Sequence, residues 1–267
     1  MANGAAEDNP GATRDPILEM RGISKSFGGL RALMDVDLDL YRGEVLAIVG
    51  DNGAGKSTLI KVLTGVYQAD TGEIRIEGKP VQIRSRRDSI DAGIAAVYQN
   101  LGLVDSLPAP ENVFLGVEPI RRILGLPFID NRAMRERTIQ ILRDRVGVSL
   151  PNVDEPTRNF SGGQRQAVAI ARAINAADLK VLVMDEPTAA LGPEETRNTL
   201  NLIRAVKDRG TSIILISHNL DHVFKVADRV QVMRGGRRAG LAVVANSTRR
   251  DVLGMIVGSD VDEDAHI

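Results

Sequence analysis

One strand-to-helix connection constrains the fold of this chain more than any other feature of its sequence. It reads Gly50-Asp51-Asn52-Gly53-Ala54-Gly55-Lys56-Ser57, follows the apolar run Val45–Val49 and precedes the helical stretch Thr58–Leu63. The glycines let the backbone turn tightly and aim N–H groups at phosphate oxygens, and the helix N-terminus favours negative charge. Lys56 adds a positive charge for the outer phosphates, and the Ser57 hydroxyl can coordinate Mg²⁺. This context predicts a phosphate-binding loop, called the phosphate loop below.

Three further apolar runs resemble Val45–Val49 in being short, continuous and followed by turn or polar residues. They are Ile94–Val97, Val181–Met184 and Ser212–Ile216. Such runs are typical of strands buried on both faces of a parallel sheet, and helical patterns lie between them. The core is therefore predicted to be α/β.

Other segments predict additions to this core. Residues 17–40 and 72–83 contain short alternating stretches, which indicate antiparallel strands with one solvated face. Residues 100–175 carry helix signals without a convincing strand, so we expect a helical subdomain there. A helix is also expected from Pro193, which suits a first turn, to Gly210, which closes it.

Two carboxylates, Asp185 and Glu186, directly follow the run Val181–Met184. Ligands of parallel sheets lie beyond the carboxyl ends of the strands, so these acids are placed to meet the same phosphates. Successive side chains on a strand point opposite ways, which allows Asp185 to face Mg²⁺ and Glu186 to face an attacking water. An acidic pair alone is more often a solvated turn, but the phosphate loop favours the functional interpretation.

Composition argues against several other classes of protein. The formal net charge of −1, with no long Lys/Arg run, disfavours non-specific nucleic-acid binding. The absence of cysteine fits a reducing compartment, and no apolar run approaches the roughly 18 residues of a membrane-spanning helix. Residues 1–16 lack the features of a secretory signal and are expected to be a disordered lead. Residues 246–267 are expected to be a C-terminal tail.

A third motif separates this chain from other nucleotidases. The sequence Phe160-Ser161-Gly162-Gly163-Gln164, called the signature segment below, opens the helical stretch Arg165–Ile174. A serine at a helix N-terminus followed by two glycines can form a second phosphate-facing site, or serve only as a helix cap. The segment resembles the signature of ATP-binding cassette (ABC) proteins, usually Leu-Ser-Gly-Gly-Gln. With the other motifs in order, the resemblance covers about residues 18–240 and implies the ABC type of P-loop NTPase fold, over about residues 17–245.

The resemblance implies roles for three isolated residues. Gln99 corresponds to the family's glutamine loop, which touches Mg²⁺ and water, and His218 corresponds to the switch histidine that contacts the terminal phosphate. Phe27 stands where an aromatic ring stacks on adenine. Taken singly, each has a simpler explanation as a surface amide, a satisfied histidine or a core residue.

The resemblance also implies a mechanism shared by two copies packed head to tail. ATP held by one copy is capped by Ser161 and Gly163 of the other, and hydrolysis releases the pair. The implied catalytic residues are Glu186, His218, Gln99 and Lys56, and the implied metal ligands are Ser57, Gln99 and Asp185. The implied nucleotide contacts are Phe27, the phosphate loop with Thr58, and Ser161, Gly162, Gly163 and Gln164. The implied partners are a second copy or a homologous ATPase subunit, transmembrane permease subunits and, indirectly, a solute-binding protein, with no nucleic acid.

Two positions depart from the family pattern. Phe160 replaces the usual leucine, which is a conservative apolar change. Ala189-Ala190-Leu191-Gly192 stands where the family usually has Ser-Ala-Leu-Asp, so the contacts of that aspartate across the dimer are in doubt. Gly192 can still serve as a helix cap.

Several segments resemble the ATPases of bacterial importers for ribose, xylose or fructose-type sugars. They are Ser26 to Leu30, Gly50 to Gly53, Gly65 to Gln68 and Glu186 to Gly192. We therefore expect a single-cassette ATPase at the cytoplasmic face of the inner membrane, attached through a permease. Residues 101–114 lie where the family docks its membrane subunit, and they form either that docking segment or a loop anchored to the core. An amino-acid importer ATPase, a soluble cassette protein and a non-enzymatic binding module remain alternatives. The last would require a defective Glu186 or Lys56, and both are present.

Overall fold

The computed structural model describes residues 15–175, 178–189 and 191–258. Within these ranges the strands are β1 (Pro16–Phe27), β2 (Leu30–Tyr41), β3 (Val45–Val49), β4 (Thr71–Ile76), β5 (Lys79–Val81), β6 (Ile94–Val97), β7 (Ile120–Ile123), β8 (Leu126–Ile129), β9 (Val181–Asp185), β10 (Ser212–Ile216), β11 (Arg229–Arg234) and β12 (Arg237–Val243). The helices are α1 (Lys56–Leu63), α2 (Arg86–Asp91), α3 (Ala109–Phe114), α4 (Asn131–Ile141), α5 (Gly162–Asn175), α6 (Pro193–Asp208), α7 (Leu220–Val226) and α8 (Arg249–Val257). Shorter turns of helix are η1 (Leu142–Val146), η2 (Thr157–Asn159) and η3 (Val244–Asn246).

The central sheet has the order β12-β11-β3-β10-β9-β6. Neighbouring strands from β11 to β6 are parallel, and β12 pairs antiparallel with β11. All four apolar runs of the sequence are strands of this sheet, as predicted. The carboxyl ends of β3 and β9 consequently lie at one edge, which brings the phosphate loop and the acidic pair together.

Two hydrophobic cores lie on opposite faces of the central sheet. Val45, Ala47 and Val49 of β3 belong to the core that includes α5 and α6, whereas Leu46 and Ile48 belong to the core shared with the antiparallel sheet. Because successive strand residues point to opposite faces, both cores need apolar side chains from the same strand. This explains why β3 is apolar at every position.

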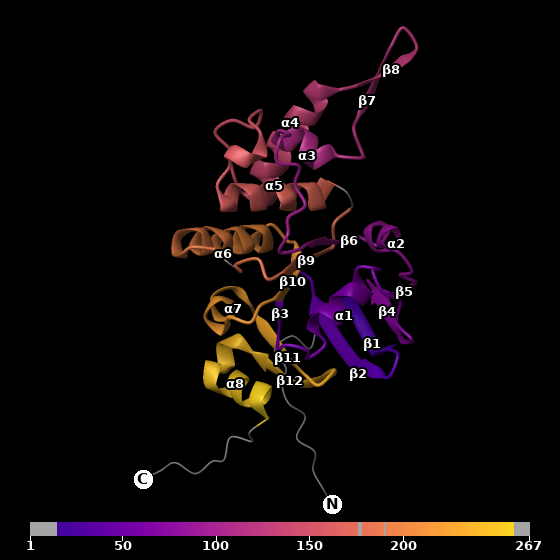
Figure 1. Cartoon of the computed structure of the whole chain (residues 1–267), viewed down its shortest axis with the longest axis vertical. Helices are drawn as coiled ribbons and strands as arrows, with labels where there is room; N and C mark the ends of the chain where they lie inside the picture. The colour runs from indigo at the N-terminus through magenta and orange to yellow at the C-terminus, as the bar shows by residue number, and fades with distance from the viewer. Residues whose placement is uncertain (1–14, 176–177, 190, 259–267) are drawn as a thin grey trace, which may run out of the picture.

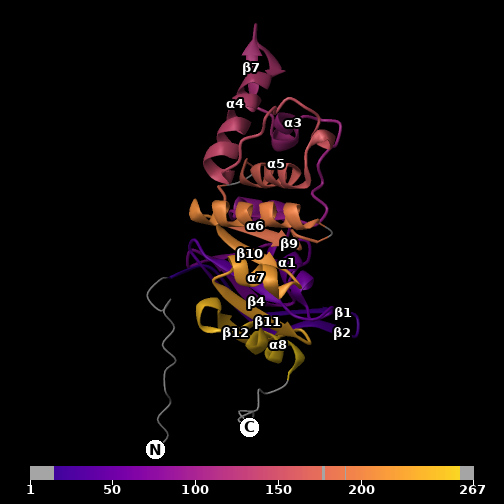
Figure 2. The same cartoon turned by 90° about the vertical axis from the view of Figure 1, so that its left-hand side faces the viewer.

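The antiparallel sheet has the order β2-β1-β4-β5, as the alternating segments predict. It lies beside α1 and the central sheet, whereas α3, α4 and α5 lie at the far end of the molecule (Figures 1 and 2). The fold is therefore a mixed-sheet core with an antiparallel sheet and a helical part, in agreement with the expected fold class.

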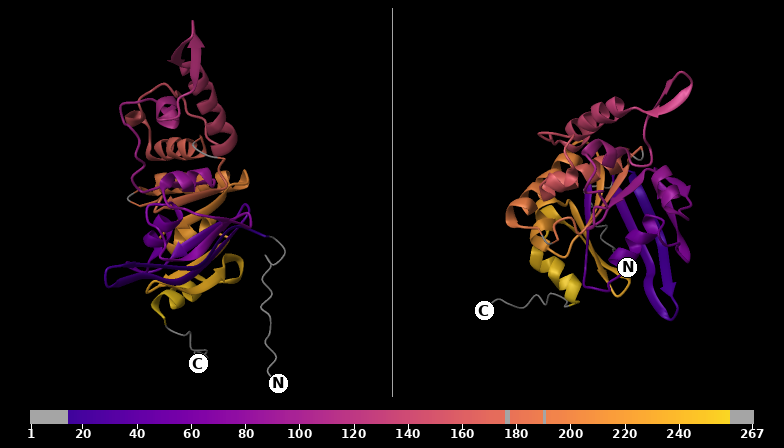
Figure 3. Two further views of the ribbon diagram at one scale, coloured as in Figure 1. Left: turned by 90° about the vertical axis from the view of Figure 1, so that its right-hand side faces the viewer. Right: turned by 45° about the horizontal axis from the view of Figure 1, so that its top comes forward.

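The helical part differs from the prediction in one respect. Residues 100–175 were expected to contain no strand, but β7 and β8 form an antiparallel hairpin within them. The hairpin extends away from the rest of the molecule (Figure 3). It carries no alternation of buried and exposed positions, since every residue of both strands is exposed. The usual period-two signal of a strand is therefore absent from its sequence.

The expected C-terminal tail also contains structure. Residues 249–257 form α8, which begins with a capping box between Thr248 and Asp251 and buries Val252. The helix packs against β11 and β12. The expected disordered lead falls mainly on residues 1–14, and the end of the expected tail on residues 259–267, and both lie outside the described residues.

Candidate functional site

Two glycines of the phosphate loop, Gly50 and Gly55, have no room for a side chain. Gly50, Gly53 and Gly55 all have positive φ angles, of 146°, 82° and 100°. A Cβ atom on Gly50 would overlap the carbonyl oxygen of Met233, and one on Gly55 would lie 2.8 Å from the carbonyl oxygen of Ala32. The loop backbone is therefore held against two distant segments, and it leads directly into α1.

Lys56 stands at the start of α1 with its side chain largely buried. Its Nζ atom donates hydrogen bonds to the carbonyl oxygens of Gly50 (2.6 Å) and Asp51 (2.8 Å). Burial lowers the pKa of Lys56, while the negative charges of Glu186, Asp51 and Asp185 oppose that shift. The Lys56 ammonium group is thus hydrogen-bonded to the loop backbone and lies near carboxylates. An anionic ligand in the loop can replace the carbonyl oxygens as its hydrogen-bond acceptor.

A cavity of about 530 Å³, called the loop cavity below, opens in front of the phosphate loop. Phe27, at the end of β1, lies on its wall as a residue that is 40% exposed, and the Tyr67 ring packs edge-on against the Phe27 ring at 4.9 Å between centroids. The cavity thus combines a partly exposed aromatic ring with a phosphate-binding backbone. Its lining residues are Phe27, Leu30, Arg31, Ala32, Asn52, Gly53, Ala54, Gly55, Lys56, Ser57, Thr58, Asp185, Glu186, Ile216, Gly235 and Gly236.

Asp185 and Glu186 line the same cavity from the end of β9. Burial raises the pKa of Asp185, and the adjacent charge of Glu186 raises it further, while Lys61 and Lys56 lower it. Glu186 has a φ angle of 50°, in the left-handed region, where a residue that is not glycine is strained. Its backbone N–H donates to the carbonyl oxygen of Ile216 (3.0 Å), which holds this strained residue against β10.

One carboxylate oxygen of Glu186 is free to accept a hydrogen bond from a ligand or a water. Its Oε2 atom is buried and receives no hydrogen bond from the described residues. The Nδ1 atom of His218 lies 2.9 Å from Oε2, but without hydrogen-bond alignment, so we regard this as an ionic contact available when the imidazole is protonated. The His218 side chain is 70% exposed, so it can move away from Glu186. A partly buried carboxylate with one oxygen that accepts no hydrogen bond is what a general base for a bound water requires.

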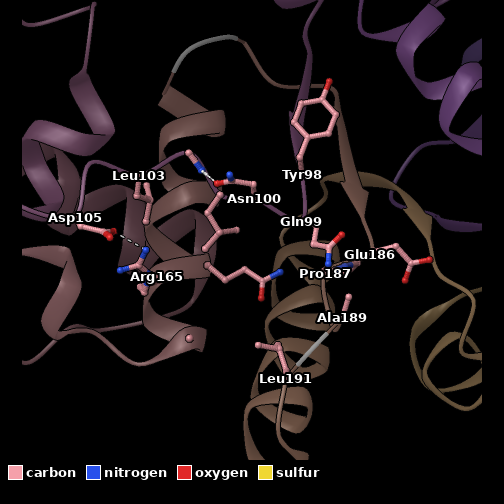
Figure 4. Close-up of a pocket in the computed structure, with 14 residues that line it drawn as sticks. Tyr98, Gln99, Asn100, Leu103, Asp105, Arg165, Glu186, Pro187, Ala189 and Leu191 are labelled. Atoms are coloured by element: carbon pink, nitrogen blue, oxygen red, sulfur yellow. Dashed lines mark hydrogen bonds and ion pairs between the residues drawn. The ribbon is translucent and has the colours of Figure 1, made fainter.

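Gln99 lies on the other side of Glu186. Both residues line a second cavity of about 370 Å³, called the side cavity below, together with Pro187 and Gly162 (Figure 4). Gln99 does not line the loop cavity, whereas Glu186 lines both cavities. The structure therefore brings Gln99 next to the predicted catalytic carboxylate but not next to the phosphate loop.

The signature segment forms the N-terminus of α5. Ser161 and Gln164 make a capping box: the Gln164 N–H donates to Ser161 Oγ (3.3 Å), and the Ser161 N–H donates to Gln164 Oε1 (2.9 Å). Gly162 and Gly163 follow in the first turn. No residue from 161 to 164 lines the loop cavity among the described residues. The segment is thus a real helix cap, and it does not reach the phosphate loop of its own chain.

Gly192 lies at the N-cap of α6, with φ −67° and ψ 168°. Its N–H donates to Glu195 Oε2 (3.3 Å), and the Glu195 carboxylate also lies beside Gly162. A Cβ atom at Gly192 would meet no heavy atom within 4 Å. The backbone here would therefore accept the aspartate that the family usually carries. The neighbouring Ala190 lies outside the described residues.

The oxygen donors around the loop cavity suit a magnesium ion. The Ser57 hydroxyl and the carboxylates of Asp185 and Glu186 line one cavity. Burial, and then the adjacent charge of Glu186, raise the pKa of Asp185, and a divalent cation would favour its charged form. Among the described residues, no three His, Cys, Asp or Glu side chains form a metal cluster of their own. Mg²⁺ usually takes one or two carboxylates together with substrate phosphates, so such a cluster is not needed.

Sequence reasoning missed the opposite wall of the loop cavity. Gly235 and Gly236, in the turn between β11 and β12, both have positive φ angles, and the Gly236 N–H donates to the carbonyl oxygen of Ala54 (3.1 Å). Leu30 and Arg31 of β2 complete that wall. The glycine pair between two apolar stretches is a hairpin signal that could have located the turn, but not its contact with the loop.

His222 is a second histidine near the acidic pair that the sequence did not single out. Its Nδ1 atom lies 3.0 Å from the Thr188 hydroxyl. Burial lowers the pKa of His222, which favours the neutral ring. In the neutral ring, Nδ1 either donates to the Thr188 hydroxyl or accepts from it, depending on the tautomer. Its contact is structural, because neither His222 nor Thr188 lines the two cavities.

Comparisons with known proteins agree with this geometry. The family described as ABC transporter matches residues 33–189. The fructose import ATP-binding protein FrcA of Rhizobium meliloti is 46% identical over 250 residues, which cover 92% of this chain and 95% of that protein. The ribose import ATP-binding protein RbsA of Caldanaerobacter subterraneus subsp. tengcongensis is 44% identical over 93% of this chain. This chain spans 49% of that protein, about half its length.

Solved structures give the same result. The ADP conformation of MJ1267, an ATP-binding cassette of an ABC transporter, matches with a TM-score of 0.77 and 28% identity, over 91% of this chain and 99% of that one. A nucleotide-free ATP-binding cassette from an ABC transporter matches with a TM-score of 0.73 and 26% identity, over 90% of this chain and 98% of that one. Among the residues that our structure describes, no helix combines the length and apolar character needed to cross a bilayer.

Proposed function

This chain belongs to the ABC transporter family, and on that premise we propose that it is the ATP-hydrolysing subunit of an importer for a monosaccharide. The observation that supports the enzymatic part is the position of Glu186, a strained and partly buried residue that lines both the loop cavity and the side cavity. One residue thereby faces the phosphate loop on one side and Gln99 on the other.

We assign the steps of hydrolysis to residues that line these cavities and to His218, which lines neither cavity but contacts Glu186. The backbone N–H groups of the phosphate loop and the Lys56 ammonium bind the phosphates, and the Phe27 ring stacks on the base. Glu186 accepts a proton from the attacking water through its unused oxygen, while His218 contacts the terminal phosphate. Ser57 and Asp185, with help from Gln99, would hold Mg²⁺, which would supply neutralising charge for the transferred phosphoryl group.

The signature segment points to a second copy as the missing part of the site. Its glycines and helix N-terminus are suited to phosphate, but within one chain it stays outside the loop cavity. We propose that the segment of one copy caps the nucleotide of another copy, or of a homologous subunit. The site is therefore complete only in a pair.

The proposed membrane partner is a permease, and its proposed docking place is a groove of about 490 Å³ at the junction of the core and the helical part. Leu101, Gly102 and Leu115 lie along it, with Arg86 of α2 and Arg172 of α5. This groove includes the beginning of residues 101–114. It would attach the chain to the cytoplasmic face of the membrane and connect it indirectly with a solute-binding protein.

Fructose is the first sugar to test, because the relative named for fructose import matches this chain over nearly its whole length. The experiment is an uptake assay with labelled fructose, ribose, xylose and an amino acid, in the source organism with and without this gene. Loss of uptake of one monosaccharide is the expected result. Loss of amino-acid uptake alone would replace the sugar assignment with the amino-acid alternative. ATP hydrolysis by the purified chain, with and without chelator, tests the enzymatic part separately.

A further inference from the structure

The hairpin formed by β7 and β8 concentrates apolar surface in a way that the ATPase site does not explain. Of the 15 large hydrophobic residues exposed in the described chain, eight lie between residues 115 and 129. Leu124, at the tip, is 99% exposed. Contiguous exposed apolar surface on a soluble protein marks a contact with another molecule or with a membrane. The eight residues are Leu115, Val117, Ile120, Ile123, Leu124, Leu126, Phe128 and Ile129.

Both faces of the hairpin are apolar. Ile120 pairs with Ile129 on one face, and Ile123 pairs with Leu126 on the other, where Phe128 also lies. A hairpin that docks flat on a protein needs one apolar face, with the other face solvated. A tip that is apolar on all sides instead suits an environment that surrounds it, as the interfacial region of a lipid bilayer does.

The charges of the hairpin are arranged to meet an anionic surface. Arg121 and Arg122 point to opposite faces close to the tip, and no described carboxylate lies within ion-pair distance of either. The two acidic residues, Glu118 and Asp130, lie at the base and accept hydrogen bonds from the backbone N–H groups of Gly116 (2.9 Å) and Ala133 (3.0 Å). Positive charge therefore lies next to the apolar tip and negative charge lies away from it.

We propose that this hairpin is a membrane-contacting element whose tip, Ile123 to Leu126, inserts into the interface of an anionic lipid bilayer. Arg121 and Arg122 reach the lipid phosphates with their long side chains while the tip lies among the upper acyl chains. Insertion is limited to the tip, because a two-stranded hairpin has unpaired backbone groups along both edges that the hydrocarbon core cannot satisfy. The contact is thus shallow and adds to the attachment that a permease provides.

A tryptophan reporter tests the contact on the full chain. The sequence contains no tryptophan, so Leu124→Trp introduces the only one, and Leu253→Trp on α8, at the other end of the molecule, is the matched control. With phosphatidylglycerol vesicles, the emission of the Leu124→Trp protein is expected to shift to the blue and to be quenched by brominated lipid. The Leu253→Trp protein is expected to show neither change. Equal behaviour of the two reporters, or no shift in either, would overturn the proposal.

Further substitutions measure separately how the positive charges and the apolar tip of the hairpin contribute to vesicle binding. Replacing Arg121 or Arg122 by Gln is expected to weaken vesicle binding about fivefold each, because each basic residue near an anionic surface contributes a comparable factor. Leu124→Glu in the protein without a reporter is expected to reduce vesicle flotation about tenfold or more. All these residues lie outside the two cavities, so ATP hydrolysis should be unchanged. Loss of hydrolysis in these variants would show that the hairpin acts in the ATPase and would count against a separate membrane contact, whereas absence of hydrolysis in the unaltered chain would question the ATPase assignment. Binding that occurs only when permease is added, on pure zwitterionic lipid as well, would show a protein contact and refute lipid insertion.

Discussion

The phosphate loop and the signature segment are both glycine-containing turns at the start of a helix, but they differ in how the rest of the chain contacts them. The phosphate loop is enclosed: Met233, Ala32 and Gly236 press against its backbone, and Lys56 is buried within it. The signature segment is open, and its serine hydroxyl caps its own helix. One loop is thus completed by distant parts of the same chain, whereas the other caps its own helix and stays outside the loop cavity.

The largest effect is expected when the enclosed site loses its carboxylate. Glu186→Gln preserves the shape of the side chain but removes the proton acceptor, so steady-state hydrolysis should fall by about 10²–10⁴-fold while ATP binding and ATP-dependent dimerisation persist. Binding by titration calorimetry and phosphate release measure the two separately. Glu194→Gln, at an exposed position at the start of α6, is the control. Normal turnover of the Glu186 variant would remove the basis of the assignment.

A side chain on the enclosed loop should be tolerated much less than one on the open segment. Gly50→Ala forces a shift against the Met233 carbonyl, and the resulting strain of about 1–3 kcal/mol should weaken ATP binding about ten- to a hundredfold. Gly163→Ala places its Cβ atom 3.6 Å from Asn198, an ordinary contact, so a single chain should keep its ATP affinity. Equal losses of affinity in the two variants would mean that the two segments do not differ in this way.

Ser161→Ala tests whether the open segment is more than a cap. Loss of the capping hydroxyl should cost about 1 kcal/mol of unfolding free energy. If the segment also caps a nucleotide on a second copy, hydrolysis should fall about tenfold or more, with no change in ATP binding to a single chain. Thr248→Ala removes a comparable cap from α8, far from the cavities, and should show only the stability loss. Denaturant unfolding and ATPase rates at several protein concentrations measure both effects, and matching ATPase rates in the two variants would leave Ser161 a structural residue.

The smallest effect is expected at Gly192. Aspartate there has space and an N-cap conformation, so Gly192→Asp should stabilise the chain by a few tenths of a kcal/mol, whereas Gly192→Ala should not. Thermal unfolding of the two variants side by side measures the difference. A destabilised aspartate variant would indicate that the nearby Glu195 carboxylate repels it.

The sequence predicts the parts of the fold whose causes are local. β3, β6, β9 and β10 are readable because strands buried on both faces must be apolar throughout. β11 is not readable in this way, because it buries Arg229 and Gln231. Their partners, Glu44 for Arg229 and the Asp37 carbonyl for Gln231, lie more than 180 residues away in the sequence.

The candidate site also consists of parts that are local in the sequence and parts that are assembled from distant segments. The phosphate loop, the acidic pair and the signature segment are contiguous motifs, so their residue types and order identify them. Arg31 of β2 and Gly236 of the β11–β12 turn form the other wall of the loop cavity. No local sequence pattern predicts that these two segments contact the phosphate loop. The hairpin of β7 and β8 was missed for a different reason, since it has no buried face to create a period.

The position of β11 beside β3 has a consequence for how this protein is made. Strand β11, which flanks β3 in the sheet, and the turn that contacts Ala54 both follow every recognisable motif in the sequence. A nascent chain that already carries every recognisable motif therefore still lacks a wall of its nucleotide cavity. The loop cavity is therefore complete only after the chain has been synthesised past Gly236.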